Sequence, residues 1–128
     1  MRREWNFLLL PRVHPSPKMK LIKISQALRS LKKLNDEIRY ADCFGEKQFT
    51  SGLIAFRPTK KSNPKQINHT DKDVVCHVIK GSGRLRIDGK RFPLTPGTIC
   101  HIPKGTPHDF AAGKSEDLIL FFSLIKTH

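Results

Sequence analysis

Acidic residues are scarce in this chain of 128 residues, which carries 24 Lys and Arg against 11 Asp and Glu, a net charge of +13. A basic surplus of this size is common in proteins that meet nucleic acid or anionic ligands. The basic residues are scattered, however, and no helix-turn-helix, aromatic-basic strand motif or zinc finger accompanies them. The sequence therefore favours a solvated basic surface, and nucleic acid is not expected as a partner.

Long apolar runs are also missing. The longest candidate, Leu118 to Ile125, has eight residues, far fewer than a membrane-spanning helix needs, and is interpreted as a buried strand. Near the start, Arg2 and Arg3 precede a short apolar stretch that Pro11 interrupts, and no small-x-small cleavage site follows. We expect no membrane partner, and we expect residues 1–18 to form a disordered extension ahead of Met19.

Cysteine is sparse. The chain has an odd number of cysteines, three, and their spacing is not that of a zinc finger: Cys43, Cys76 and Cys100. This usage indicates a reducing, cytoplasmic location. Cys76 and Cys100 lie within apolar runs, where a free cysteine behaves as a small buried hydrophobe. Other common catalytic sites are not indicated, because the sequence has no G-x-S-x-G motif, no phosphate-cradling glycine motif and no paired carboxylates on the expected strands.

The pattern that is present divides the chain into two parts. Residues 19–48 form an N-terminal segment in which the spacing of Ala27, Leu28, Leu31 and Leu34 predicts a helix over 25–34, with Ser25 as its N-cap. From residue 49 to 128 short apolar stretches alternate with turn residues, which indicates an all-β sandwich or barrel. The expected strands are 49–56, 74–79, 84–87, 90–94, 98–102, 108–111 and 118–125.

The most informative stretch runs from Gly97 to His108. It reads as a turn, a short apolar strand, a corner rich in proline and glycine, and a histidine directly after that corner. This order suits a small β-barrel that aims one imidazole into its own mouth, where such folds usually bind ligands and metals. His108 is therefore the first candidate for a functional side chain.

From Ser51 to Ile125 the chain resembles the small single-domain cupins, whose fold is a double-stranded β-helix or jelly-roll barrel. The second cupin motif is matched by Gly97, Pro103, Gly105 and His108, whereas Ala112 stands at its asparagine position. In the first motif Gly81 and His69 fit. Val74 occupies the glutamate position and Ile67 that of the other histidine.

The resemblance implies a divalent transition metal (Fe, Mn, Ni, Cu or Zn) held by His69 and His108, because imidazole and carboxylate groups suit these ions. Asp71 lies two residues from His69, so on an extended strand it shares that face and could supply the missing oxygen. Asp73 should point the other way.

Strand alternation places Val74, Cys76 and Val78 on the pocket side and His77 on the opposite face. His77 and His101 are therefore favoured as hydrogen-bonded histidines at a sheet or subunit contact. A second metal or pocket site formed by these two histidines stays open as an alternative.

The resemblance implies a homodimeric barrel that binds a small molecule, which the basic surplus predicts to be polar or anionic. A metal-dependent oxygenase, isomerase or decarboxylase is one hypothesis. The other is a metal-free, non-catalytic barrel for binding or sensing a ligand, and Val74 at the glutamate position favours it because valine makes that wall more apolar.

Overall fold

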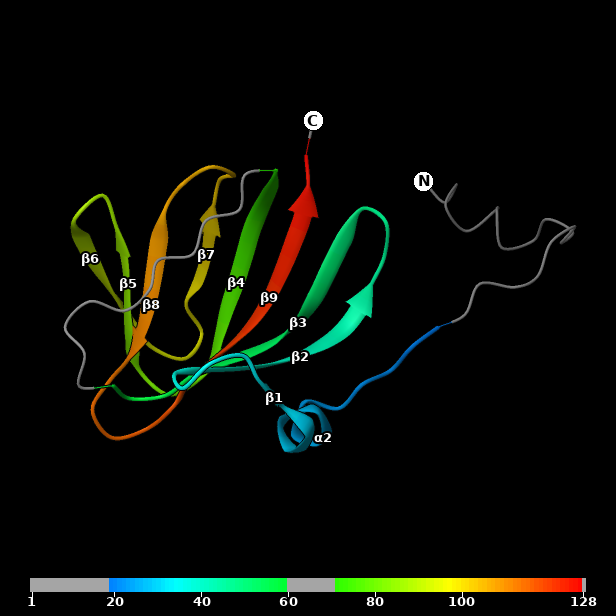
Figure 1. Cartoon of the computed structure of the whole chain (residues 1–128), viewed down its shortest axis with the longest axis horizontal. Coiled ribbons are helices and arrows are strands. Elements are labelled where there is room, and N and C mark those ends of the chain that lie inside the picture. Colours follow the sequence, from blue (N-terminus) through cyan, green and yellow to red (C-terminus); the bar gives the residue numbers. More distant parts are fainter. Residues whose placement is uncertain (1–18, 60–70, 128) are drawn as a thin grey trace, which may run out of the picture.

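Two antiparallel sheets pack on each other in the part of the chain that the structure describes (Figure 1). The computed structural model describes residues 19–59 and 71–127. Its elements are α2 (Ile24–Ala27), η2 (Leu28–Ser30), β1 (Lys32–Lys33), β2 (Ile38–Gly45), β3 (Phe49–Phe56), β4 (Lys72–Lys80), β5 (Gly83–Ile87), β6 (Lys90–Leu94), β7 (Ile99–Ile102), β8 (His108–Ala112) and β9 (Leu118–Lys126).

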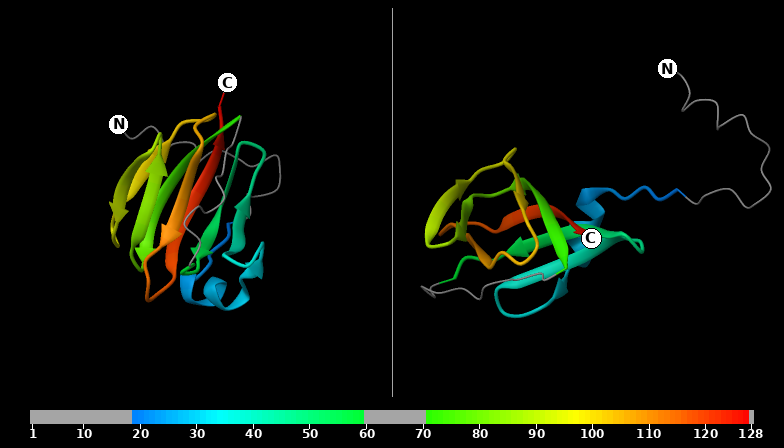
Figure 2. Two further views of the ribbon diagram at one scale, coloured as in Figure 1. Left: turned by 60° about the vertical axis from the view of Figure 1, so that its left-hand side comes forward. Right: turned by 90° about the horizontal axis from the view of Figure 1, so that it is seen from above.

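The larger sheet has the strand order β1-β2-β3-β9-β4-β7, and the smaller sheet has the order β6-β5-β8. Seen from above, the strands curve into an open roll (Figure 2). The architecture confirms the expected jelly-roll barrel with a short N-terminal helix. Within the described ranges, no helix has the length and apolar character needed to cross a membrane.

Strand alternation builds the core between the sheets. On β4, Val74, Cys76 and Val78 are almost completely buried, whereas the intervening His77 is exposed on the outer face. On β9, Leu118 and Leu120 face the same core and have no exposed surface. The period-two pattern of the sequence thus determines which side chains can reach the interior.

The N-terminal segment differs from expectation. Helical structure ends at Ser30 rather than Leu34, and Ser25 makes no capping hydrogen bond because the N-cap is Lys23. Leu31 is extended, after which Lys32–Lys33 pairs with β2. A one-turn helix gains few hydrogen bonds for its nucleation cost, so strand pairing decides the conformation here.

The larger sheet begins before residue 49. Strand β2 pairs with β3 from Ile38↔Phe56 to Gly45↔Thr50, with an irregularity between Asp42 and Phe44. Part of segment 19–48 therefore belongs to the barrel wall. The expectation for residues 1–18 lies outside the described residues.

Candidate functional site

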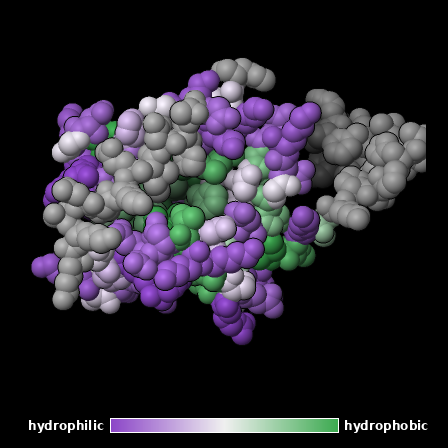
Figure 3. All heavy atoms as spheres, in the orientation of Figure 1, coloured by the Kyte–Doolittle hydropathy of each residue, from purple (hydrophilic) through white to green (hydrophobic). Residues whose placement is uncertain are grey.

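A cavity of about 440 Å³ lies between the sheets. In Figure 3 hydrophobic residues fill the hollow in the middle of this face, and hydrophilic residues surround it. Thirteen of the described residues line the cavity; nine are aliphatic or phenylalanine side chains, and the others are Asn35, Tyr40, Cys76 and His108. The nine are Leu34, Ile38, Ile54, Phe56, Val74, Phe110, Leu120, Phe122 and Leu124.

The corner before β8 brings His108 to this cavity. Thr106 N–H donates to the Pro103 carbonyl at 3.3 Å, and Gly105 has a φ of +79°, as the third residue of a type II turn requires. The Lys104 N–H donates to Asp73 Oδ1 at 3.0 Å. The corner is thus anchored to β4 by a carboxylate on the outer face of the sheet.

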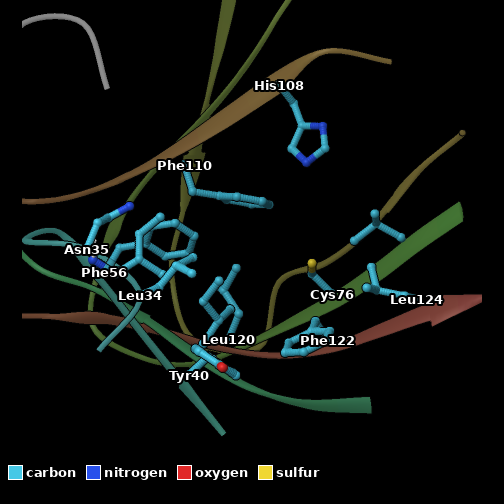
Figure 4. Close-up of a pocket in the computed structure, with 13 residues that line it drawn as sticks. Leu34, Asn35, Tyr40, Phe56, Cys76, His108, Phe110, Leu120, Phe122 and Leu124 are labelled. Atoms are coloured by element: carbon cyan, nitrogen blue, oxygen red, sulfur yellow. Dashed lines mark hydrogen bonds between the residues drawn. The ribbon is translucent and has the colours of Figure 1, made fainter. Parts of the chain in front are cut away.

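His108 is 2% exposed, and Figure 4 shows its ring pointing from β8 into the cavity. Its Nδ1 lies 2.8 Å from the carbonyl oxygen of Thr106, so Nδ1 must be the donor of that hydrogen bond. Nδ1 therefore carries a hydrogen in this arrangement of the ring. Phe110, two residues further along the same face, meets the imidazole edge-on at 5.6 Å.

Two further polar side chains at the cavity come from the N-terminal segment and were missed by the sequence interpretation. Asn35 Oδ1 accepts the backbone N–H groups of Glu37 at 2.8 Å and Ile38 at 2.9 Å, which fixes the turn into β2. Tyr40 is half-buried at the cavity wall. The alternation of Ile38 and Tyr40 with polar neighbours was the signal that could have identified this strand.

The structure brings some of the predicted site residues together. His108, Val74 and Cys76 all line the cavity, whereas Val78 packs in the hydrophobic core and is not among the lining residues. Asp71 is exposed just before β4 and does not line the cavity. His69 lies outside the described residues.

The two outer-face histidines have different neighbours. His101 is opposite Val75 in the β4–β7 ladder and donates from Nε2 to Asp73 Oδ2 at 2.9 Å. His77 is opposite Ile99 and exposed, beside a shallow hollow that Ile22 and Ile24 also line. Across residues 19–59 and 71–127, no group of three His, Cys, Asp or Glu side chains could hold a metal ion.

Asp73 is expected to make the stability of the fold decrease at acidic pH. The hydrogen bond from His101, and then the one from the Lys104 N–H, lower the pKa of Asp73 below its usual value of 3.8. A lowered pKa in the folded state stabilises the protein above pH 3.8, and this stabilisation is lost as the pH falls through the lowered pKa. The melting temperature of Asp73→Asn should therefore lie below the wild-type value at pH 7, and the difference should shrink as the pH falls below the usual value.

Thermal melts followed by circular dichroism measure this difference. Asp36→Asn is the control, because Asp36 makes an exposed ion pair with Lys33 at 3.2 Å and does not anchor the corner before β8. A pH-independent difference between wild type and Asp73→Asn would contradict the role of the carboxylate charge.

The comparisons with known proteins agree with this architecture. The family model described as "Cupin domain" matches residues 52–124. A comparison with curated proteins finds no match.

Solved structures similar to this chain include a predicted oxalate decarboxylase from Thermotoga maritima, with a TM-score of 0.72 and 14% identity over 84% of this chain and 100% of that one. KdgF from Halomonas sp. has a TM-score of 0.65 and 15% identity, and the match covers 77% of this chain and 89% of that one. A cupin-2 domain protein from Shewanella frigidimarina has a TM-score of 0.64 and 18% identity, and the match covers 83% of this chain and 95% of that one. At these identities the likeness concerns the fold.

The family model covers more than half of the chain, and its range contains nine of the thirteen described residues that line the cavity. The chain belongs to the cupin family.

Proposed function

We propose that this cupin binds a small, largely apolar molecule in the cavity between its sheets, with His108 at the polar end of the site. The observation that carries the proposal is the lining of the cavity, in which a few polar groups stand among aliphatic and aromatic side chains. A cavity of about 440 Å³ is within the range of small-molecule sites.

The lining favours an apolar ligand over the polar or anionic one that the net charge predicted. Within residues 19–59 and 71–127, no lysine or arginine lines the cavity, so these ranges offer a buried anion no lysine or arginine partner there. Moving an ion out of water without a partner is costly, whereas each Å² of apolar surface buried contributes about 25 cal/mol.

A substitution that fills the cavity tests the proposal. Leu124 lines the cavity, and its neighbour Ile125 is 37% exposed and points to the other side of β9. Leu124→Trp should weaken binding of the neutral fluorophore N-phenyl-1-naphthylamine by about tenfold or more, because the indole occupies the ligand's volume. Fluorescence titration measures the affinity, and circular dichroism checks that each variant is folded.

Ile125→Trp is the matched control, because it adds the same side chain one residue away on the outer face. It should leave the affinity unchanged, and citrate, an anionic probe, should not displace the fluorophore. Equal weakening by both substitutions, or displacement by citrate, would contradict an apolar ligand in this cavity.

A metal-dependent activity is the second candidate. It is favoured by His108, whose Nδ1–H donates to a backbone carbonyl, as the second ring nitrogen of metal-bound histidines usually does. The described donors at the cavity are His108 and Cys76, however, and these do not make the three or four ligands of a transition-metal site. A metal site would need donors outside the described residues, of which His69 is the one that the cupin motif predicts.

Metal quantification separates the two candidates. A metal site predicts about one equivalent of Zn or Mn per chain after loading and dialysis, lost in both His69→Ala and His108→Ala. If the wild type takes up less than about a tenth of an equivalent, the metal hypothesis is rejected. Binding of the fluorophore should survive removal of metal by EDTA under our proposal.

The homodimer and the cytoplasmic location remain proposals based on the sequence. Sedimentation equilibrium measures the oligomeric state directly, and a monomer at micromolar concentration would contradict the first of them.

A further inference from the structure

Cys76 and Cys100 face each other across neighbouring strands. They are register partners in the antiparallel β4–β7 ladder, and both are free thiols. Cys76 is 2% exposed and lines the cavity, whereas Cys100 is only partly buried and packs against the same core. Directly opposed residues of a ladder have side chains on the same face, so the two sulfur atoms lie on one side of the sheet.

The ladder spacing suits a covalent bond between them. Two residues further along, the Val78 N–H donates to the Thr98 carbonyl at 2.8 Å, which marks that pair as hydrogen-bonded. Pair types alternate along an antiparallel ladder, so Cys76 and Cys100 also form a hydrogen-bonded pair, whose Cα atoms are typically about 5.5 Å apart. Disulfides span Cα separations of about 4.4–6.8 Å.

The two thiols are chemically unequal. A hydrogen bond from the Cys76 thiol lowers the pKa of Cys100, and the Cys76 N–H and the nearby His101 act in the same direction against the effect of burial. The same hydrogen bond, together with burial, raises the pKa of Cys76. Cys100 is therefore the thiol that more readily becomes a thiolate, and it is also the more accessible of the two.

We propose that Cys76 and Cys100 form a redox site, which hydroperoxides oxidise reversibly to a disulfide between β4 and β7. The proposal does not depend on the identity of the cavity ligand. It adds a modification site to the cavity wall, because one of the two sulfurs lines that wall.

The reaction has two steps. The thiolate of Cys100 attacks the terminal oxygen of the hydroperoxide, the O–O bond breaks, and the alkoxide or hydroxide leaves with a proton, which gives a sulfenic acid on Cys100. The sulfur of Cys76 then attacks the sulfenic sulfur and loses its proton, while the hydroxyl group leaves as water. In total, two thiols are oxidised and one peroxide is reduced to an alcohol or water, together with one further water molecule.

This order explains how a buried cysteine can take part. Cys76 never has to meet the oxidant, since it reacts only with the sulfur opposite it. Cys43, the third cysteine, is on β2, which is not a neighbour of β4 or β7 in the sheet. It serves as an internal reference thiol.

Intact mass spectrometry after maleimide labelling tests the proposal. The reduced, denatured chain should take three labels, one for each cysteine. After treatment of the folded protein with hydrogen peroxide and then denaturation, it should take a single label, at Cys43, and the three labels should return after dithiothreitol. Trypsin should release peptides 73–80 and 92–104 as one linked species.

The variants test the assigned roles. Cys100→Ser should leave Cys76 reduced in the folded protein, and Cys76→Ser, with Cys76→Ala as a second version, should stop at a sulfenic acid on Cys100 that dimedone traps. Cys43→Ser should form the same linked peptide as the wild type. Three labels retained after peroxide treatment, or a disulfide that involves Cys43, would overturn the proposal, and so would equal oxidation of Cys76 in the Cys100→Ser variant.

Discussion

Gly81→Ala is expected to lower the free energy of unfolding by about 4 kcal/mol, one of the largest effects of any single methyl group in this chain. Gly81 has a φ of +81°, a conformation that costs a residue with a Cβ about 1–2 kcal/mol. A Cβ at this position would also lie 1.9 Å from the Asp117 carbonyl oxygen, so the backbone before β9 would have to move. Strain and collision therefore add at one site.

Gly89→Ala separates the two causes. Gly89 has a similar φ of +75°, but a Cβ there would have no atom within 4 Å. It should lose only the conformational term, about 1 kcal/mol. Urea denaturation measures both variants, and equal losses would show that the contact with Asp117 has no energetic weight.

Gly81 also shows why much of the fold could be predicted from the sequence. The first cupin motif places a glycine here, and the structure supplies the reason, which is a positive φ against the backbone of another turn. The same holds for Asp88 and Gly89, which separate the expected strands 84–87 and 90–94 and have φ values of 52° and 75° in the hairpin between β5 and β6. Turn chemistry is local, so one sequence is enough to read it.

The N-terminal wall of the cavity could not be predicted in the same way. Leu31 and Leu34 have helical spacing, yet the chain is extended there because Lys32–Lys33 pairs with β2. Whether strand pairing outweighs a short helix depends on residues far away in the sequence. The contributions of Asn35 and Tyr40 to the cavity were missed for this reason.

Which side chains lie opposite each other on neighbouring strands could not be predicted from the sequence either. Alternation placed His77 on the outer face, but only the register shows that His101 lies diagonally from Asp73, with which it bonds. The same register places Cys76 opposite Cys100. A shift of the β4–β7 register would change all of these partners, and only the assembled sheet fixes it.

The character of the cavity shows the limit of arguments from net charge. The charge of +13 suggested an anionic ligand, yet no lysine or arginine of the described ranges lines the cavity. Two of the arginines instead meet a carboxylate on the opposite face of β8. Arg84 and Arg86 both bind Asp109, the residue between His108 and Phe110.

Asp109→Asn is expected to lower the free energy of unfolding by about 3 kcal/mol, the lower end of the cost of breaking a buried ion pair. Asp109 has no exposed surface, and its oxygens lie 2.6 Å from Arg84 Nη1 and 2.8 Å from Arg86 Nη2. The amide keeps the shape of the side chain but leaves both guanidinium groups without a counter-charge. About a fifth of each arginine side chain is exposed, so water recovers part of the loss.

A compensated variant shows whether charge is the cause. Replacing all three residues with apolar ones, Arg84→Met, Arg86→Met and Asp109→Leu, should recover most of the lost stability, because no charge is then left unpaired. Urea denaturation of the two variants and the wild type gives the comparison. If Asp109→Asn loses less than about 1 kcal/mol, the three residues behave as exposed surface ion pairs, and another feature must hold β8 against β5. If the loss is as large as expected, the ion pairs on the outer face of β8 fix the strand that presents His108 and Phe110 to the cavity.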